Sequence, residues 1–348
     1  MENLAMQAKL KNVLVLVLVL LLSPSVYAQS NTNEKLWTIN DLLNEQPRPF
    51  AIGHRGYGVN LGENEDQPIE NTLAAVERAF EEGISIVEVD VVITADGKAV
   101  VMHDDYLSDY SCVNQYSYDE LKARVQYVPK LSQILLKARK YARKSDHISG
   151  LVIIEVKSPA PMCDPADTSE EALVLSVIKA VQQSGMEEQV IVESFSPAIN
   201  GLFAAYVPSL PRNLTLDALQ LLTADQIEAI TGLSVTLIDK QAGFGLQWAE
   251  IGPLYRLPGY TSLEQYISVA FASMAKFLTI DIRVIAQMEM AQPGSAAMLM
   301  AYLHDMGFVV TVYTASSELE WMFLSQQGID GIFVDDIPMG VQMQQLSQ

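Results

Sequence analysis

Residues 84–104 read ISIVEVDVVITADGKAVVMHD, and this stretch decides the fold. Two apolar runs flank Asp96-Gly97, and Asp-Gly between two such runs is a strong β-hairpin signal. The run that ends at His103 is therefore expected to lie antiparallel to the run before it, outside any parallel sheet. If Asp96 and Gly97 are the two loop residues, Asp90 pairs with His103 across the hairpin.

Without that arm, eight strand candidates remain, and helical patterns or long crossovers separate them. They are 50–53, 84–93, 151–156, 190–193, 234–238, 277–280, 308–313 and 331–334. Strands that alternate with helices form a parallel sheet. Eight of them favour a single α/β domain, a (β/α)8 TIM-type barrel with a short β-hairpin arm after its second strand, over a doubly wound sheet.

The composition limits the partners. The chain has 348 residues, 49% of them hydrophobic, and a formal net charge of −20. Proteins that bind nucleic acid or anionic lipid nonspecifically need clustered Lys and Arg. The acidic balance argues against both partners, so an anionic substrate would have to be attracted by a local site.

The first 28 residues have the pattern of a secretory signal peptide. Lys9 and Lys11 precede an apolar run over 13–22, and small residues follow at the cleavage positions before residue 29. That run is shorter than the roughly 20 residues that span a bilayer, although an uncleaved anchor is the alternative. We expect an exported protein, periplasmic or secreted, with a signal peptide over 1–28, a polar tether over 29–48 and the barrel over 49–345.

The chain contains two cysteines, Cys112 and Cys163, and each follows a predicted strand that carries a motif. Export would place them in an oxidising compartment, where disulfides persist. Two interpretations stay open, a disulfide between the two residues or two unrelated buried thiols.

Three carboxylates come from two predicted strands. Glu88 and Asp90 are two residues apart and share one face of a strand, while Glu155 ends another strand with Lys157 on its face. Buried carboxylates this close repel each other unless a cation lies between them. An all-oxygen ligand set suits Ca²⁺ or Mg²⁺ rather than zinc. We expect one such divalent ion at Glu88, Asp90 and Glu155; the alternative is a solvated Glu-x-Asp.

Further polar residues lie next to predicted strand ends. His54 and Arg55 follow the first strand, where barrels of this type keep their active sites. Arg55 can form a two-pronged contact with a phosphate. Glu70 and Asn71 precede the first helix on the same side, although Asn71 is otherwise explained as a helix cap. With His103, these residues suit the cleavage of a phosphodiester.

Several short motifs occur in a fixed order along the chain. They are His54-Arg55-Gly56, Ile69-Glu70-Asn71-Thr72, Glu88-Val89-Asp90, Thr94-Ala95-Asp96-Gly97, His103-Asp104, Glu155-Val156-Lys157 and Ser194-Phe195. In this order they resemble the glycerophosphodiester phosphodiesterase family, and a closing segment over 310–335 extends the resemblance. Tyr313 stands where the family usually has Trp, which bears on the packing of the substrate rather than on catalysis.

The resemblance implies a (β/α)8 barrel and metal-dependent hydrolysis of a small-molecule glycerophosphodiester to glycerol 3-phosphate and an alcohol. It implies His54 and His103 as acid and base, Arg55 and Lys157 as phosphate contacts, Glu70 and Asn71 as supporting residues, and Glu88, Asp90 and Glu155 as metal ligands. No nucleic-acid partner is expected, and no stable membrane anchor after signal cleavage.

Two other functions stay open on the same barrel. One is a lipid-directed phospholipase D-type phosphodiesterase, similar to lysophospholipase D or sphingomyelinase D, which a broad apolar rim at the mouth would favour. The other is a non-catalytic phosphodiester-binding envelope protein, which should have lost a histidine or a carboxylate. Residues 243–260 are predicted to be an aromatic loop that either walls the leaving-group pocket or packs on the barrel rim.

Overall fold

The computed structural model describes residues 35–143, 149–166, 168–237, 243–248 and 252–347. The predicted signal peptide and residues 29–34 of the predicted tether lie outside this part. Within it, no helix has both the length and the apolar character needed to cross a membrane.

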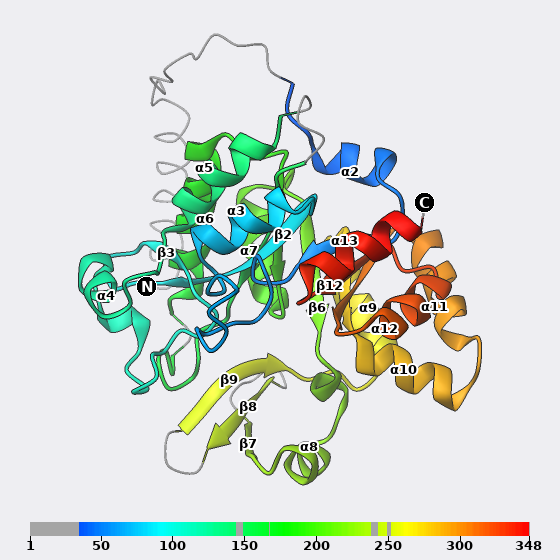
Figure 1. The fold of residues 1–348 in the computed structure, drawn as a ribbon. Helices are drawn as coiled ribbons and strands as arrows, with labels where there is room; N and C mark the ends of the chain where they lie inside the picture. The colour runs from blue at the N-terminus through cyan, green and yellow to red at the C-terminus, as the bar shows by residue number, and fades with distance from the viewer. Residues whose placement is uncertain (1–34, 144–148, 167, 238–242, 249–251, 348) are drawn as a thin grey trace, which may run out of the picture. The chain divides into compact units, whose positions relative to one another are not determined.

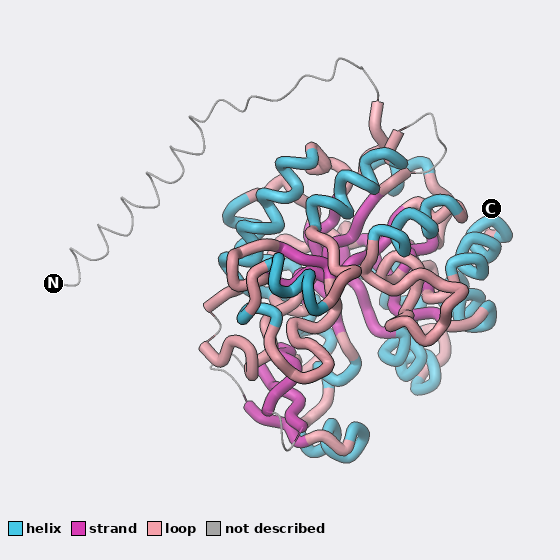
Figure 2. The backbone as a smooth tube through the Cα atoms, turned by 60° about the vertical axis from the view of Figure 1, so that its left-hand side comes forward, coloured by secondary structure: helices cyan, strands magenta, loops and turns pink. Residues whose placement is uncertain are grey.

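Parallel strands close into a barrel inside a ring of helices (Figure 1, Figure 2). Their order is β1-β12-β11-β10-β6-β5-β4-β2, and the pairing of β1 with β2 closes the ring. The strands are β1 (Phe50–Gly53), β2 (Ile86–Ile93), β4 (Leu151–Val156), β5 (Val190–Ser194), β6 (Arg212–Leu216), β10 (Phe277–Asp281), β11 (Val309–Ala315) and β12 (Gly331–Val334). The predicted eight-stranded barrel is confirmed.

The strands have two different faces. In β2, Val87 and Val89 pack outward in the main apolar core, whereas Ile86, Glu88 and Asp90 point inward. The helices that cover the outer face are α3 (Leu73–Glu81), α5 (Leu131–Tyr141), α6 (Glu170–Ser184), α7 (Pro197–Tyr206), α9 (Leu263–Ala272), α10 (Ile282–Ala291), α11 (Ser295–Asp305), α12 (Glu318–Gln326) and α13 (Ile337–Leu346). The short helix α4 (Tyr118–Arg124) packs instead in a separate apolar cluster beside the hairpin arm. Polar groups on the inward face are therefore free to build a site.

One further helix, α2 (Ile39–Glu45), precedes the first strand. Its Ile39 and Leu42 are buried and belong to the same apolar cluster as Phe50 and Phe277 inside the barrel. This part of the segment 29–48, expected to be a polar tether, thus contributes to the core at the amino-terminal ends of the strands.

The fifth barrel strand is β6, and the prediction that residues 234–238 form it is wrong. Asn213 and Thr215 of β6 point into the barrel and bind Glu193, so this strand lacks the continuous apolar run that marks its neighbours. Because these inward-facing side chains are polar and build part of the site, hydrophobic patterning does not predict this strand.

The residues predicted as that strand belong to a separate antiparallel sheet. It consists of β7 (Ser234–Leu237), β8 (Gly243–Trp248) and β9 (Gly252–Pro258), and it follows α8 (Ala224–Thr231) and a short 3-10 helix over Ala218–Leu221. The predicted loop over 243–260 is therefore mostly two strands.

The β-hairpin arm is confirmed, but its predicted register is off by one residue. The short strand β3 (Ala99–Val101) pairs Ile93 with Ala99 and Val91 with Val101. The loop has three residues rather than two, because Gly97 adopts a positive φ of 70° and its N–H bonds to Thr94 O. Asp90 is thus opposite Met102, and a loop beyond β3 positions His103.

Candidate active site

A cavity of about 440 Å³ lies at the carboxyl ends of the barrel strands. Motifs far apart in the sequence meet in its wall because parallel strands carry them to one end of the barrel. Among the predicted residues, the wall contains His54, Arg55, Glu88, Asp90, His103, Glu155 and Lys157. Glu70 and Asn71 contact Arg55 and Asp90 from behind.

The three predicted metal ligands converge. Glu88, Asp90 and Glu155 are buried, and each offers an oxygen within 4.8 Å of the others. Asp90 and Glu155 are direct neighbours on β2 and β4. Burial, together with the charges of Asp90 and Glu155, raises the pKa of Glu88 well above its usual range. The cluster is therefore strained electrostatically unless a cation joins it.

Two side-chain cations face these carboxylates. Lys157 Nζ lies 2.7 Å from Asp90 Oδ1 and 2.5 Å from Glu155 Oε1. Arg55 donates to Glu70 Oε1 at 2.8 Å, and its Nε lies 3.6 Å from Asp90 Oδ2. Burial alone would raise the pKa of Asp90, but the positive charges around it, Lys157 first, lower that pKa below its usual value. Asp90 is thus ionised.

Asn71 holds Asp90 in place. Its Nδ2 donates to Asp90 Oδ2 at 2.8 Å, and its Oδ1 accepts from Asp90 N at 3.0 Å. Asn71 has a positive φ of 57°, a conformation that Asn tolerates better than most residues. The helix cap is instead Thr72, which accepts from Ala75 N at 3.1 Å. Asn71 is therefore a supporting residue of the carboxylate cluster.

His54 is paired with a carboxylate from the other end of the chain. Its Nδ1 lies 2.8 Å from Asp335 Oδ1, which also accepts from Val59 N. Gly58 makes this pairing possible, because its φ is 91° and a Cβ there would lie 2.1 Å from Asp335 O. Burial alone would raise the pKa of Asp335, but its bond with His54 lowers it. Asp335 was not predicted as a site residue, although it ends the segment 310–335 that extends the family resemblance.

His103 has a carboxylate partner beside it in the sequence. Its Nδ1 lies 2.8 Å from Asp104 Oδ1. Burial alone would raise the pKa of Asp104, but the bond and charge of His103 lower it. Each catalytic candidate thus has Nδ1 engaged by a carboxylate, which fixes the orientation of the ring and leaves Nε2 for proton transfer.

Another acid, Glu193, lines the cavity and was not predicted as a site residue. It neighbours Glu155 on the adjacent strand and accepts from Asn213 Nδ2 at 2.9 Å and Thr215 Oγ1 at 2.6 Å. Burial, followed by the charge of Glu155, raises the pKa of Glu193 to about 8. The sequence feature that could have identified Glu193 as a site residue is its position near the carboxyl end of a predicted barrel strand.

The remaining wall is partly aromatic. Phe195 and Tyr313 pack edge to face with ring centroids 6.3 Å apart, and Tyr313 Oη lies 3.3 Å from Asp217 Oδ2. From the predicted loop over 243–260, the described side chains in this wall are Arg256 and Leu257, and Arg256 donates to Asp164 O at 2.9 Å. The end of β9 thus forms part of the cavity wall.

Comparison with known proteins places this arrangement in a family. The sequence pattern of the glycerophosphoryl diester phosphodiesterase family matches residues 54–339, so the chain belongs to that family. A glycerophosphodiester phosphodiesterase of Caldanaerobacter subterraneus subsp. tengcongensis is 31% identical over 160 residues, which is 43% of this chain and 59% of that protein. The chain thus spans about six-tenths of the length of the curated relatives that it matches first.

Solved structures show the same fold. A putative glycerophosphoryl diester phosphodiesterase from Silicibacter pomeroyi has a TM-score of 0.62 at 19% identity, covering 86% of this chain and 93% of the other. A phosphodiesterase from Oleispira antarctica, solved with the product sn-glycerol-3-phosphate, has a TM-score of 0.55 at 19% identity, covering 85% and 96%.

The residues present fit the divalent metal that the family implies. All three carboxylates offer oxygen, the donor that hard cations prefer. Among the described residues, Glu88 Oε1 is buried and has no hydrogen-bond partner. A buried carboxylate oxygen without a partner is costly, and a bound cation would satisfy it. Glu88, Asp90 and Glu155 could therefore hold the ion.

Proposed function

We propose that this protein hydrolyses glycerophosphodiesters to glycerol 3-phosphate and an alcohol. The observation that carries the proposal is one cavity with two histidine–carboxylate pairs, His54–Asp335 and His103–Asp104, beside a buried cluster of three carboxylates. Membership of the family supports it. So does the product sn-glycerol-3-phosphate bound to the Oleispira antarctica phosphodiesterase.

The two histidines act as general base and general acid in the proposed reaction. The glycerol 2-hydroxyl attacks phosphorus and gives its proton to Nε2 of one neutral histidine, while the other, protonated histidine protonates the departing alcohol oxygen. Water then attacks the cyclic phosphate. The second histidine takes the proton of this water, and the first returns its proton to the 2-oxygen. Both histidines end in their starting states.

The cations of the cavity bind the phosphate. Phosphoryl transfer depends mainly on positioning and on neutralising negative charge. Arg55 and Lys157 line the cavity and supply two fixed positive charges. A Ca²⁺ or Mg²⁺ ion held by Glu88, Asp90 and Glu155 would add Lewis-acid polarisation of a phosphoryl oxygen when bound. Glu70 and Asn71 keep Arg55 and Asp90 in position.

Substitution of each histidine tests the proposal. His54→Ala and His103→Ala should each lower kcat about 10²–10⁴-fold, measured as glycerol 3-phosphate released from glycerophosphocholine and glycerophosphoethanolamine with Ca²⁺ or Mg²⁺. His304→Gln is the matched control, because His304 also pairs with a carboxylate, Asp330, but lies outside the cavity. Near-normal turnover by either catalytic variant would refute the two-histidine assignment.

A lipid-directed phosphodiesterase is a second candidate, and one observation favours it. A further cavity of about 900 Å³ adjoins the first and shares Arg55 and His103 with it. Its lining includes exposed apolar side chains, namely Leu61, Tyr110 and Tyr127. A lysophospholipid with kcat/KM above that of glycerophosphocholine would establish this candidate; no turnover of the lysophospholipid would exclude it.

We also propose that the protein is exported to the periplasm or the medium. The pattern over residues 1–28 and the Cys112–Cys163 disulfide support this location, because disulfides persist in oxidising compartments. Amino-terminal sequencing of the protein purified from its native cells should find a start near residue 29. A cytosolic protein that retains residues 1–28 would contradict the proposal.

A further inference from the structure

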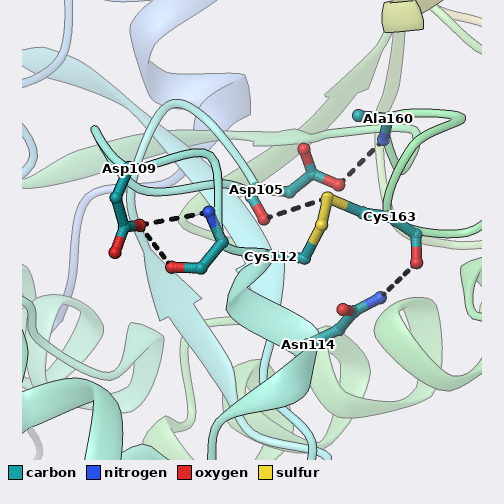
Figure 3. The surroundings of a disulfide bond; sticks show 7 residues. Asp105, Asp109, Cys112, Asn114, Ala160 and Cys163 are labelled. Atoms are coloured by element: carbon teal, nitrogen blue, oxygen red, sulfur yellow. Dashed lines mark hydrogen bonds between the residues drawn. A yellow bond between two sulfur atoms is a disulfide. The ribbon is translucent and has the colours of Figure 1, made fainter. Parts of the chain in front are cut away.

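Two loops that line the active-site cavity are joined by a disulfide. Residues 102–112 follow β3 and carry His103, and residues 157–166 follow β4 and carry Lys157. The Cys112–Cys163 bond joins the far ends of these loops, with Cα atoms 5.5 Å apart (Figure 3). The first of the two interpretations of the cysteines therefore holds.

Other contacts reinforce the same connection. Asp105 Oδ2 accepts a hydrogen bond from Ala160 N at 2.8 Å, and Asn114 Nδ2 donates to Cys163 O at 2.9 Å (Figure 3). Tyr106 packs against Ala160 and Cys163 in a small apolar cluster of its own, apart from the barrel core. The loop that carries His103 is thus held by the neighbouring loop as well as by the barrel.

Asp105 is the carboxylate in this connection that lies nearest to His103 in the sequence. Burial raises the pKa of Asp105 to about 6, so the group is mostly ionised at neutral pH and its bond to the Ala160 N–H is charge-assisted. Its backbone carbonyl also accepts from Val113 N at 2.7 Å. The backbone hydrogen bonds between the hairpin arm and β2 end one residue before His103, with the bond from Met102 N to Asp90 O.

We propose that Asp105 and the Cys112–Cys163 disulfide form a clamp that positions His103 relative to Lys157. The disulfide does not line the cavity, and Asp105, which does, has its Oδ2 engaged by the Ala160 N–H, so we assign both to the positioning of His103. The inference rests on the proposed function, which assigns proton transfer to His103. Displacement of a catalytic group by about 1 Å can lower the rate about 10²-fold. Loss of the clamp should therefore lower kcat more than it changes KM.

Four variants test the clamp. Asp105→Ala and the double variant Cys112→Ser/Cys163→Ser should each lower kcat roughly 10- to 100-fold with KM within about twofold. Asp105→Asn should keep kcat within about threefold, because its amide oxygen still accepts from the Ala160 N–H. Asp109→Ala is the control on the same loop, since its exposed carboxylate pairs with Arg124 rather than with residues 157–166, and it should behave as wild type.

Hydrogen exchange provides a readout that does not depend on activity. Backbone amides over 103–113, except that of Ser111, which donates to Asp109, should exchange faster in Asp105→Ala and in the double variant than in wild type and Asp109→Ala. A wild-type protein that hydrolyses no glycerophosphodiester would refute the proposed function, while hydrogen exchange would still decide on the clamp. If the double variant does not fold, the contrast between Asp105→Ala and Asp105→Asn decides. Unchanged kcat and unchanged exchange in Asp105→Ala would overturn the inference, and so would an equal loss of kcat in Asp105→Asn.

Discussion

Substitution of Asn71 should destabilise the protein and also loosen the proposed metal site. The side chain makes two hydrogen bonds to Asp90, one to the carboxylate and one from the backbone N–H, and both residues are buried. Asn71→Ala removes both partners at once. It also places Ala at a φ of 57°, which Asn accepts more readily.

The magnitude follows from these contacts. A hydrogen bond to a charged group contributes about 1.5–3 kcal/mol, and a buried N–H left without a partner costs about 1–3 kcal/mol. The backbone adds about 1 kcal/mol for Ala in the left-handed region. The free energy of unfolding of Asn71→Ala should therefore fall by about 3.5–7 kcal/mol. Because the Asp90 carboxylate can then rotate, its affinity for Ca²⁺ or Mg²⁺ should fall about 10-fold or more.

Urea unfolding of metal-free protein and calorimetric titration with the metal measure the two effects. Asn71→Gly serves as the control, because Gly tolerates the positive φ but lacks the amide. We expect Asn71→Gly to lose at least about 3 kcal/mol, since it lacks the same hydrogen bonds. Wild-type stability in Asn71→Gly together with a loss in Asn71→Ala would attribute the effect to the backbone and refute the hydrogen-bond argument.

Three further predictions concern the metal, pH and redox state. Ca²⁺ or Mg²⁺ at 100 times its Kd should stabilise metal-free protein by about 2.7 kcal/mol, seen as a higher Tm; the same rise in Asp90→Asn would count against this ligand. Burial raises the pKa of Asp105 to about 6, above its value in the unfolded chain. Because the folded protein then binds the Asp105 proton more tightly than the unfolded chain does, the free energy of unfolding should fall as pH rises from about 4 to about 6. In Asp105→Asn that slope, worth at most about 3 kcal/mol, should disappear from urea unfolding curves, and its persistence would exclude Asp105 as the source. The Cys112–Cys163 bond has a sequence separation of 51, so its loss in the double Ser variant should lower the free energy of unfolding by about 4 kcal/mol on the chain-entropy estimate, and an unchanged urea midpoint would contradict that estimate.

Most of the barrel was predictable from the sequence because the outward-facing residues of its strands are apolar even where the inward-facing residues are polar. Val87 and Val89 mark β2 even though Glu88 and Asp90 alternate with them. In β6, a strand of five residues, the inward-facing Asn213 and Thr215 leave too few apolar residues for the strand to be recognised from the sequence. The apolar run at 234–238 was therefore predicted as the fifth barrel strand, although it belongs to the antiparallel sheet. Apolar patterning thus fails where a short strand contributes to the polar interior.

The site was predictable where its geometry is local. Glu88 and Asp90 share a face because strands have a period of two, and all nine predicted residues line the cavity or contact a residue that does. The pairing of His54 with Asp335 depends on the parallel pairing of β12 with β1, the last and the first barrel strands along the chain. The position of His103 depended on the positive φ of Gly97, which set a three-residue loop. Such details follow from tertiary closure and turn conformation, not from composition.

The antiparallel sheet β7–β9 has a consequence for how this protein could diversify. The sheet is inserted between β6 and β10, and together with α8 it has its own small apolar cluster around Ile227. Its described contribution to the cavity is Arg256 and Leu257, at the end of β9. The barrel strands, the hairpin arm and the loops that follow them carry the two histidines and the carboxylates of the cavity. The insertion is thus a separable unit: exchanging it would change part of the cavity wall while the histidines and carboxylates stayed with the barrel.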